Sequence, residues 1–247
     1  MNCKNCDTSF DTNFCPQCGQ SADVKRITMA GFVSEFSEGV FQVNHGLFYT
    51  LSELFVRPGY TLREYLRGKR KDHFKPLPYL ITFSTLYFIA SRLFGGNTWM
   101  NDFIFGFENF DDNSQQTVAP IFFAWLSQNF AYASLLLLPI FAFASYLAFR
   151  NRGFNYAEHA VINAFITGQQ ALIYTILIIL SAPFDHVFLE LLPTLISLLY
   201  FFWVYNQFFQ PKATWSNLLR SALTYLIYFL VNIVLLLVAG KLFSTLT

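Results

Sequence analysis

A run rich in basic residues ends at Pro76, and an uninterrupted apolar run begins at Leu77. We call the basic segment, Arg57–Lys75, the collar; it carries seven Lys or Arg residues against two acids. About twenty apolar residues cross a bilayer, and basic residues remain on its cytoplasmic side. This junction therefore predicts a membrane-spanning chain and the side of the membrane on which its N-terminus lies.

The composition agrees with a chain that is mostly embedded in lipid. Of 247 residues, 54% are apolar and 13% are charged, whereas about 25% of the residues in soluble domains are charged. The 31 Phe and 13 Tyr residues fit a lipid-facing surface with aromatic residues at its interfaces. We expect an all-α integral membrane protein with about five transmembrane helices, preceded by interfacial amphipathic helices and a minimal zinc ribbon.

The apolar segments predict a five-span transmembrane domain over residues 76–247. We expect the spans at about 77–94, 130–149, 159–182, 187–208 and 218–243. Pro139 should kink or break the second span, because proline removes a helical hydrogen bond. Residues 118–129 are either an outer interfacial helix or part of that span, and the aromatic and acidic loop Trp99–Phe110 should lie at the outer interface.

The distribution of charge predicts the orientation of the spans. With the N-terminus inside, residues 1–76, 150–158 and 209–220 are cytoplasmic, and they hold 14 of the 16 Lys and Arg residues. The outer loop between Gly95 and Val118 carries acids but no Lys or Arg. Residues 1–20 lack the apolar region of a signal peptide. This pattern predicts a bacterial inner-membrane protein with a cytoplasmic N-terminus and an outer C-terminus.

All four cysteines lie in residues 1–26, as two CxxC pairs: Cys3 with Cys6, and Cys15 with Cys18. Each CxxC turn presents two thiolates, and four thiolates in a tetrahedron are typical of structural zinc. Gly19 favours the second turn, since glycine accepts a positive φ. In the reducing cytoplasm we expect structural Zn²⁺ rather than disulfides or free thiols. Nucleic acid is not an expected partner, because this ribbon has no basic stripe.

The neck, residues 27–75, contains three short amphipathic helical patterns. Apolar residues recur at helical spacing in 29–40 and in 47–55, and Thr28 is the expected N-cap of the first helix. Thr61 and Glu64 have the spacing of a capping box for the third. None of these patterns is long enough to span a bilayer. We expect the helices to lie at the cytoplasmic interface or to pack under the spans.

Two interpretations of the collar remain open. The simpler is a positive-inside anchor, in which each basic side chain contributes about 1 kcal/mol of attraction to an anionic leaflet. The sharper is a headgroup or phosphate site built from Arg63, Arg67, Lys69 and Arg70. The segment is not a P-loop, because Arg63 and Arg70 replace the first Gly and the final Ser or Thr of that motif. Both interpretations predict anionic membrane lipids as partners.

The ribbon and neck also carry a set of short motifs: CxxC…CPxCG, His45-Gly46-Leu47, Thr50, Pro58-Gly59, Tyr65-Leu66-x-Gly68-Lys69-Arg70 and Pro76. Together they resemble an uncharacterised family of bacterial membrane proteins, classed as a domain of unknown function. The resemblance covers the ribbon, the neck and the first span, and continues to Tyr156-Ala157-Glu158-His159, which looks like that family's second motif. It implies a membrane-protein architecture and no particular reaction.

Three residues form a candidate site at the cytoplasmic face: His45 in the neck, and Glu158 with His159 at the start of the third span. A Glu beside a His can transfer protons or bind a metal, and we expect both histidines to lie near the collar. The simpler alternatives are Glu158 as a favourable charge at a helix N-terminus and His45 as a packing or capping residue. The chain has no HExxH or GxSxG motif, so catalytic residues stay unassigned.

Two polar stripes lie within the predicted spans. Asn163, Thr167, Gln170 and Tyr174 share one face of the third span, and Ser221, Tyr225, Tyr228 and Asn232 share one face of the fifth. We expect interhelical hydrogen bonds worth roughly 0.6–2 kcal/mol each, with Gln170 meeting Asn232. The alternative is a polar groove for a lipid headgroup or small solute. No charged residue lies near the middle of a predicted span, which argues against ion-coupled transport.

Three functional hypotheses follow. The first is a non-enzymatic scaffold or adaptor, whose zinc ribbon and neck bind a cytoplasmic protein partner or anionic lipid; its five spans also resemble a eukaryotic trafficking family that binds small GTPases. The second is an enzyme or flippase that handles a lipid or phosphate headgroup at the cytoplasmic face. The third is a small-solute channel or carrier that uses the polar stripes.

Overall fold

The computed structural model describes residues 1–39, 46–94, 130–183, 187–211 and 214–246. His45, the loop Trp99–Phe110 and residues 118–129, on which the sequence made predictions, lie outside the described residues. Within the described ranges the regular elements are helices, and the ribbon adds two isolated β-bridges, Asn2↔Ser9 and Phe14↔Ser21. The prediction of an all-helical protein is confirmed for this part of the chain.

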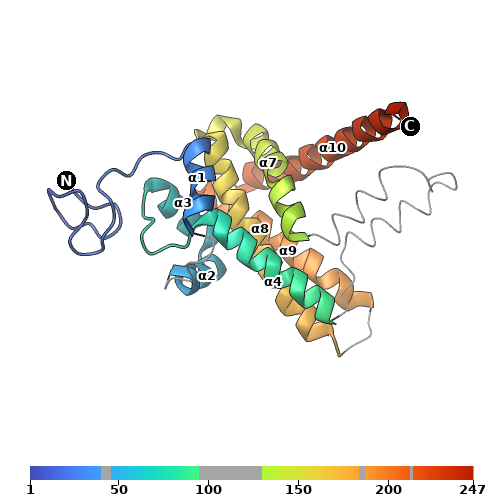
Figure 1. Ribbon diagram of the computed structural model, residues 1–247, viewed down its shortest axis with the longest axis horizontal. Coiled ribbons are helices and arrows are strands. Elements are labelled where there is room, and N and C mark those ends of the chain that lie inside the picture. The colour runs from blue at the N-terminus through green and yellow to red at the C-terminus, as the bar shows by residue number, and fades with distance from the viewer. Residues whose placement is uncertain (40–45, 95–129, 184–186, 212–213, 247) are drawn as a thin grey trace.

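The helices are, in chain order, α1 (Met29–Gly39), α2 (Gly46–Val56), α3 (Pro58–Arg67), α4 (Pro76–Phe94), α7 (Phe130–Phe149), the 3₁₀ turn η2 (Arg150–Arg152), α8 (Tyr156–Ser181), α9 (Val187–Phe208) and α10 (Thr214–Leu246). Figure 1 shows the ribbon at one end of the molecule, α4, α8 and α9 in its centre, and α10 extending away from them. The C-terminus therefore lies far from the ribbon.

Helix α8 is the centre of the bundle. Its first ten residues after Tyr156 are all buried, as expected for a helix that neighbours cover on every side. Helices α4, α7 and α9 pack around it. On the α4 side, the Tyr79 ring lies 5.5 Å from the Phe165 ring, and the Tyr79 hydroxyl donates to Oε1 of Gln169. Helix α10 instead packs on α7 and α9, which leaves most of its surface exposed.

Four helical segments are long and apolar enough to cross a membrane: Pro76–Phe94, Ala133–Arg152, Tyr156–Ser181 and Thr214–Leu235. The prediction of a multi-pass membrane protein is confirmed at this level. The remaining predicted span, 187–208, coincides with α9, and its role as a span stays a prediction. Helix α7 continues through Pro139, so this proline does not break the helix, and the other expected outcome, a kink, stays a prediction.

The neck forms the three predicted helices, with one error at a helix start. Thr28 Oγ1 accepts a hydrogen bond from the Gly31 N–H at 3.3 Å, as expected of an N-cap. Helix α3 begins at Pro58, whose fixed φ suits the first turn. Thr61 is therefore inside the helix, where its hydroxyl donates to the Arg57 carbonyl at 3.0 Å. The predicted capping box at Thr61 and Glu64 is wrong.

Candidate functional site

The four cysteines meet in one cluster within the ribbon. One sulfur atom from each lies within 4.8 Å of all the others. The Sγ atoms of Cys3 and Cys18 are 3.6 Å apart, and those of Cys6 and Cys15 are 3.5 Å apart. Sulfurs bound at about 2.3 Å to a tetrahedral ion lie about 3.8 Å from one another. The cluster is therefore close to the geometry of a closed four-thiolate metal site.

The local backbone explains how two short turns present these sulfurs. The residue after each second cysteine has a positive φ: 59° at Asp7 and 72° at Gly19. In each turn this residue donates its N–H to the carbonyl of the first cysteine, at 3.0 Å to Cys3 and 2.8 Å to Cys15. The positive φ predicted for Gly19 is thus confirmed, and Asp7 fills the same place in the first turn.

The thiols differ in acidity before any metal is considered. Hydrogen bonds with Thr8 lower the pKa of the Cys6 thiol to about 6. Burial raises the pKa of the Cys18 thiol to about 12. Because metals bind thiolates, a cation at the centre would favour ionisation of all four sulfurs together.

Hydrogen bonds fix the ribbon onto the collar. The side-chain Oε1 of the buried Gln20 accepts the backbone N–H of Arg70 at 3.1 Å and that of Lys71 at 3.2 Å. The Asn5 amide donates to the Asp72 carboxylate at 2.8 Å. Both anchors lie within two residues of a cysteine, so the two cysteine-bearing turns and the collar form one unit.

The four collar residues proposed as a headgroup site have different roles in the structure. Arg63 donates to the carbonyls of Phe208 and, at 2.7 Å, of Gln210, at the C-terminus of α9. Lys69 pairs with Glu64 at 3.3 Å. Arg70 donates to the Tyr65 carbonyl at 3.2 Å and to the Lys25 carbonyl at 3.0 Å. Arg67 is exposed.

Three of these cations therefore bind groups of the protein. The sequence could not place Arg63 on α9, because the two segments are more than 140 residues apart. Its position follows a general rule, since a cation at a helix C-terminus offsets the negative end of the helix dipole. Arg220 does the same for α7 by donating to the Ala148 carbonyl at 2.6 Å.

Glu158 and His159 point to different surroundings. Glu158 completes a capping box with Asn155 at the start of α8 and forms an ion pair with Arg26, whose Nη2 lies 2.6 Å from Oε2. His159 is fully buried, and its Nδ1 lies 3.0 Å from the Ser145 hydroxyl on α7. Glu158 thus contacts Asn155 and Arg26, and Arg26 precedes the collar. This geometry fits the simpler interpretation of Glu158, a favourable charge at a helix N-terminus.

A buried polar network links α7, α8 and α9 beside His159. Asn163 donates to the Ser145 hydroxyl at 2.8 Å, and Tyr205 donates to the Asn163 carbonyl oxygen at 3.1 Å. All four residues are fully buried, so the network lacks access for a substrate. It connects three helices by hydrogen bonds, which is the role expected of polar side chains within a helical membrane bundle.

Sequence reasoning also missed His73, which lies at the end of the collar. It is buried between the rings of Tyr49 and Tyr65, with centroid distances of 5.1 and 5.9 Å. Its Nε2 has no hydrogen-bond partner among the described residues. Burial lowers the pKa of His73 to about 4, and the positive charge of Lys69 adds to this effect. The position of His73, three residues before Pro76 at the start of α4, gave no signal of this burial.

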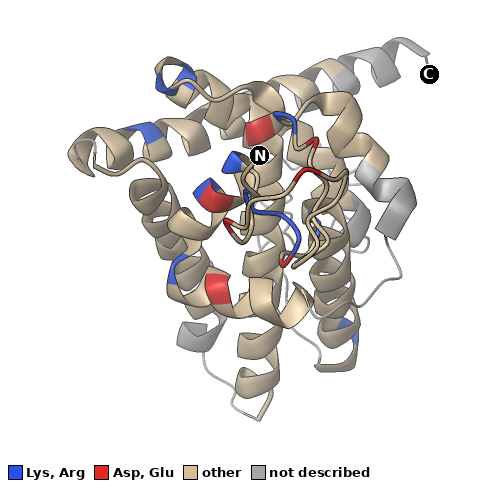
Figure 2. Ribbon diagram, turned by 90° about the vertical axis from the view of Figure 1, so that its left-hand side faces the viewer, with Lys and Arg blue, Asp and Glu red and all other residues tan. Residues whose placement is uncertain are grey.

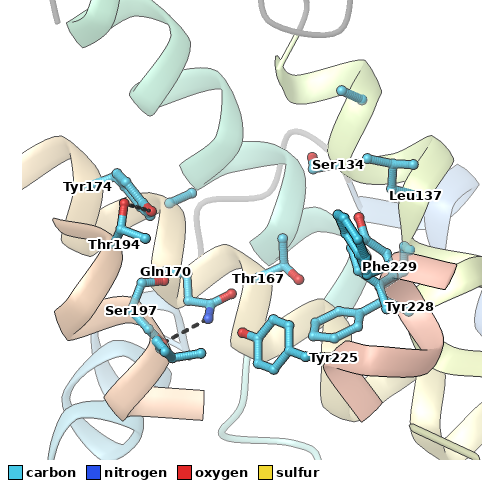
Figure 3. A pocket seen from close by; sticks show the side chains of 15 residues that line it. Ser134, Leu137, Thr167, Gln170, Tyr174, Thr194, Ser197, Tyr225, Tyr228 and Phe229 are labelled. Atoms are coloured by element: carbon cyan, nitrogen blue, oxygen red, sulfur yellow. Dashed lines mark hydrogen bonds between the residues drawn. The ribbon is translucent and has the colours of Figure 1, made fainter. Parts of the chain in front are cut away.

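Of the four polar residues predicted to make contacts within the spans, Thr167 and Gln170 line a cavity. Gln170 donates to the Ser197 carbonyl on α9 at 3.0 Å, and Asn232 donates to the Tyr228 carbonyl of its own helix at 2.7 Å. The predicted pairing of Gln170 with Asn232 is therefore not found among the described hydrogen bonds. Figure 3 shows Thr167, Gln170 and Tyr225 around a space between the helices. This cavity has a volume of about 440 Å³.

The comparisons with known proteins add one match, which falls on the neck and α4. Residues 45–88 match the model of a family described as "Protein of unknown function (DUF3667)". Within this range, Gly59 approaches α9 so closely that a Cβ atom would lie 2.4 Å from the Phe208 nitrogen. No curated protein and no solved structure matches the chain. Residues 45–88, in the neck and the first candidate span, thus fit an uncharacterised family.

Proposed function

We propose that this protein is a non-enzymatic scaffold or adaptor of the bacterial inner membrane. Its ribbon binds structural Zn²⁺ in the cytoplasm, and the ribbon and neck together dock a cytoplasmic protein partner while the collar lies against anionic lipid. Helix α9 serves as a span in addition to the four candidate segments, so that the chain crosses the membrane five times and the C-terminus lies outside. The observation that carries this proposal is the bond of Gln20 to two collar N–H groups, because it makes the metal-binding head a fixed part of the membrane protein.

The distribution of charge supports this orientation. Apart from Arg92, the basic side chains that the structure describes lie in the ribbon, the neck, the 3₁₀ turn η2 and the first two turns of α10. Figure 2 looks onto this end of the molecule, where Lys and Arg residues surround the ribbon. Basic residues concentrate on the cytoplasmic side of a membrane, and the same side keeps the four thiols reduced and available to metal.

Two exposed apolar regions suggest different surroundings for the head and the neck. On the ribbon, which lies outside the helical bundle, the side chain of Phe14 is 62% exposed. On α2, Phe48 and Val56 are 73% and 72% exposed, while Leu54 packs against the bundle. Tyr200 of α9 donates to the Leu54 carbonyl at 3.0 Å, which puts α2 beside a predicted span. We infer that α2 faces lipid and that Phe14 faces the protein partner.

The alternative in which the collar binds a phosphate or headgroup has less support. Arg63, Lys69 and Arg70 already donate to protein carbonyls or pair with Glu64. A phosphate site needs several cationic donors that converge on one space. A small-solute carrier remains the second candidate, because a few polar side chains face the largely apolar cavity between α7, α8, α9 and α10.

Site-specific photo-crosslinking in cells tests the adaptor proposal. A photoreactive phenylalanine analogue at Phe14 should give one discrete protein adduct, which disappears when Cys15 and Cys18 are both replaced by Ser. The same analogue at Leu93, exposed at the far end of α4, is the matched control and should not give this adduct. Adducts with lipid alone, or the same adducts from both positions, would contradict a protein-docking head.

A further inference from the structure

The cavity between α7, α8, α9 and α10 has the size and lining of a ligand site. Its volume of about 440 Å³ falls in the range of small-molecule pockets, roughly 300–1,000 Å³. The lining side chains come from all four helices. They are Ala133, Ser134, Leu137, Leu138 and Phe141 of α7, Thr167, Gln170, Ala171 and Tyr174 of α8, Thr194, Ser197 and Leu198 of α9, and Tyr225, Tyr228 and Phe229 of α10. Most of the lining is apolar, and a few polar groups face the space.

The cavity lies near the middle of the candidate spans. Gln170 is fourteen residues beyond the first residue of α8, and Tyr225 is eleven beyond the first residue of α10. At 1.5 Å per residue these positions are roughly 15–20 Å into the helices, about half of a 30 Å hydrocarbon core. An occupant must therefore enter from lipid or between the helices.

The polar groups of the lining leave hydrogen-bonding capacity for an occupant. Gln170 uses one amide hydrogen on the Ser197 carbonyl. Within the described residues this is the one hydrogen bond recorded for the Gln170 amide, which leaves its other N–H and its oxygen for an occupant. The Thr167 hydroxyl, which Figure 3 shows facing the cavity, has no hydrogen-bond partner among the described residues either. Both groups come from one face of α8, one turn apart.

The lining excludes a charged occupant. None of its described lining residues is Asp, Glu, Lys, Arg or His, and an unpaired charge at this depth would lose its hydration without compensation. One wall is aromatic: the Phe141 ring lies 5.7 Å from the Tyr225 ring and 5.1 Å from the Tyr228 ring. Aromatic and aliphatic walls with two neighbouring hydrogen-bonding groups fit an apolar molecule that carries an oxygen function.

We propose that this cavity binds a neutral lipid that carries a carbonyl or hydroxyl group, held by Thr167 and Gln170 between α7, α8, α9 and α10. The oxygen accepts a hydrogen bond from Gln170 or Thr167, and the aliphatic part lies against Leu137, Leu138 and Leu198. The site is separate from the ribbon and the collar, and it gives the membrane domain a function beyond anchoring.

Native mass spectrometry and thermal unfolding of the full chain in lipid nanodiscs test this proposal. The probes are decylubiquinone and 1,2-dioctanoylglycerol, which are neutral and carry carbonyl groups, and dioctanoyl phosphatidate, which is anionic. We expect at least one neutral probe to form a saturable one-to-one complex and to raise the unfolding temperature, while the anionic probe neither binds there nor competes. Which neutral probe binds more tightly distinguishes a quinone source from a glyceride source.

Variants separate a binding site from a packing defect. Thr167→Val together with Gln170→Leu removes the polar groups at nearly constant volume. This double variant should bind the neutral probe with an affinity lower by about fivefold or more. Thr175→Val is the matched control, because this threonine is on the same helix, bonds to the Ala171 carbonyl and does not line the cavity. Equal affinity in wild type and the double variant, equal binding of the anionic probe, or no saturable neutral complex would each overturn the proposal.

Discussion

The Arg26 guanidinium and the Glu158 carboxylate form a two-pronged ion pair, with Nε 2.8 Å from Oε1 and Nη2 2.6 Å from Oε2. The pair joins the last residue of the ribbon segment to the first turn of α8. Arg26 also donates to the Gly153 carbonyl at 2.8 Å. Glu158 is almost fully buried, and its carboxylate contacts both Arg26 and the backbone N–H of Asn155.

The first prediction concerns this pair. Arg26→Ala leaves the buried carboxylate without its cation and should lower the free energy of unfolding by about 1–3 kcal/mol. Lys25→Ala is the matched control, because Lys25 pairs with Asp23 where both side chains are largely exposed, and such pairs contribute less than about 1 kcal/mol. Thermal unfolding in nanodiscs measures both. Equal losses in the two variants would contradict the structural role given to Arg26.

The second prediction concerns Arg63 at the C-terminus of α9. Arg63→Lys keeps the charge but loses the planar set of donors that reaches the Phe208 and Gln210 carbonyls, so it should destabilise the protein by about 1–2 kcal/mol. Arg67→Ala removes an exposed cation nearby and should change stability by less than 0.5 kcal/mol, roughly the range of surface substitutions. If Arg63→Lys instead left stability unchanged and weakened anionic-lipid binding, the headgroup interpretation would regain its support.

The third prediction tests the close approach of α3 to α9. In Gly59→Ala the new Cβ would lie 2.4 Å from the Phe208 nitrogen and 2.7 Å from the Gln207 carbonyl carbon, so the helices must separate. We expect a loss of roughly 3 kcal/mol or a failure to accumulate in the membrane. Gly31→Ala is the control, since its nearest neighbour within 4 Å is Thr28 Oγ1 at 3.4 Å. Alanine in α1 should be neutral or stabilising by up to about 1 kcal/mol.

The fourth prediction concerns the pH dependence of stability through His73. Burial and Lys69 lower the pKa of this histidine from 6.5 to about 4, against the opposing charges of Glu53, Glu64 and Asp72. Between pH 6.5 and about pH 4, His73 is therefore protonated in the unfolded chain and neutral in the folded chain. The contribution of His73 is fully present above pH 6.5 and is lost as pH falls toward 4, by on the order of 3 kcal/mol.

Unfolding temperatures measured from pH 7.5 to pH 4.5 check this prediction. His73→Phe keeps a ring between Tyr49 and Tyr65 but cannot bind the proton, so its stability should fall less steeply with acid. Parallel curves for wild type and His73→Phe would show that His73 is not the group responsible.

The predicted and observed helices agree where local pattern decides the structure. Long apolar segments gave the positions of α4, α7, α8, α9 and α10, because burial or lipid contact favours a helix over such lengths. The two CxxC turns likewise gathered the four sulfurs, since the chain between them is short. The start of α3 was mispredicted because Pro58, whose fixed φ suits the first turn of a helix, begins the helix three residues before the predicted cap at Thr61.

The long-range partners could not be predicted from a single sequence. Arg26 and Glu158 are 132 residues apart, and Gln20 and Arg70 are 50 apart. Nothing in the local pattern distinguishes an Arg that caps another helix, such as Arg63, from one that binds phosphate. The cavity is a similar case: the stripe containing Thr167 and Gln170 was visible, but whether it faced a helix or a space depended on how α10 packs.

The most direct test of the account is the metal content of the purified full-length protein. Native mass spectrometry should find one Zn²⁺ per chain, and Cys15→Ser with Cys18→Ser should abolish it and increase trypsin cleavage at Lys69–Lys71, because Gln20 would no longer hold this loop. Asp23→Asn, an exposed change in the same segment, should alter neither. Two disulfides in place of zinc, or unchanged protection of the collar after zinc is lost, would contradict a metal-held head fixed to the membrane domain.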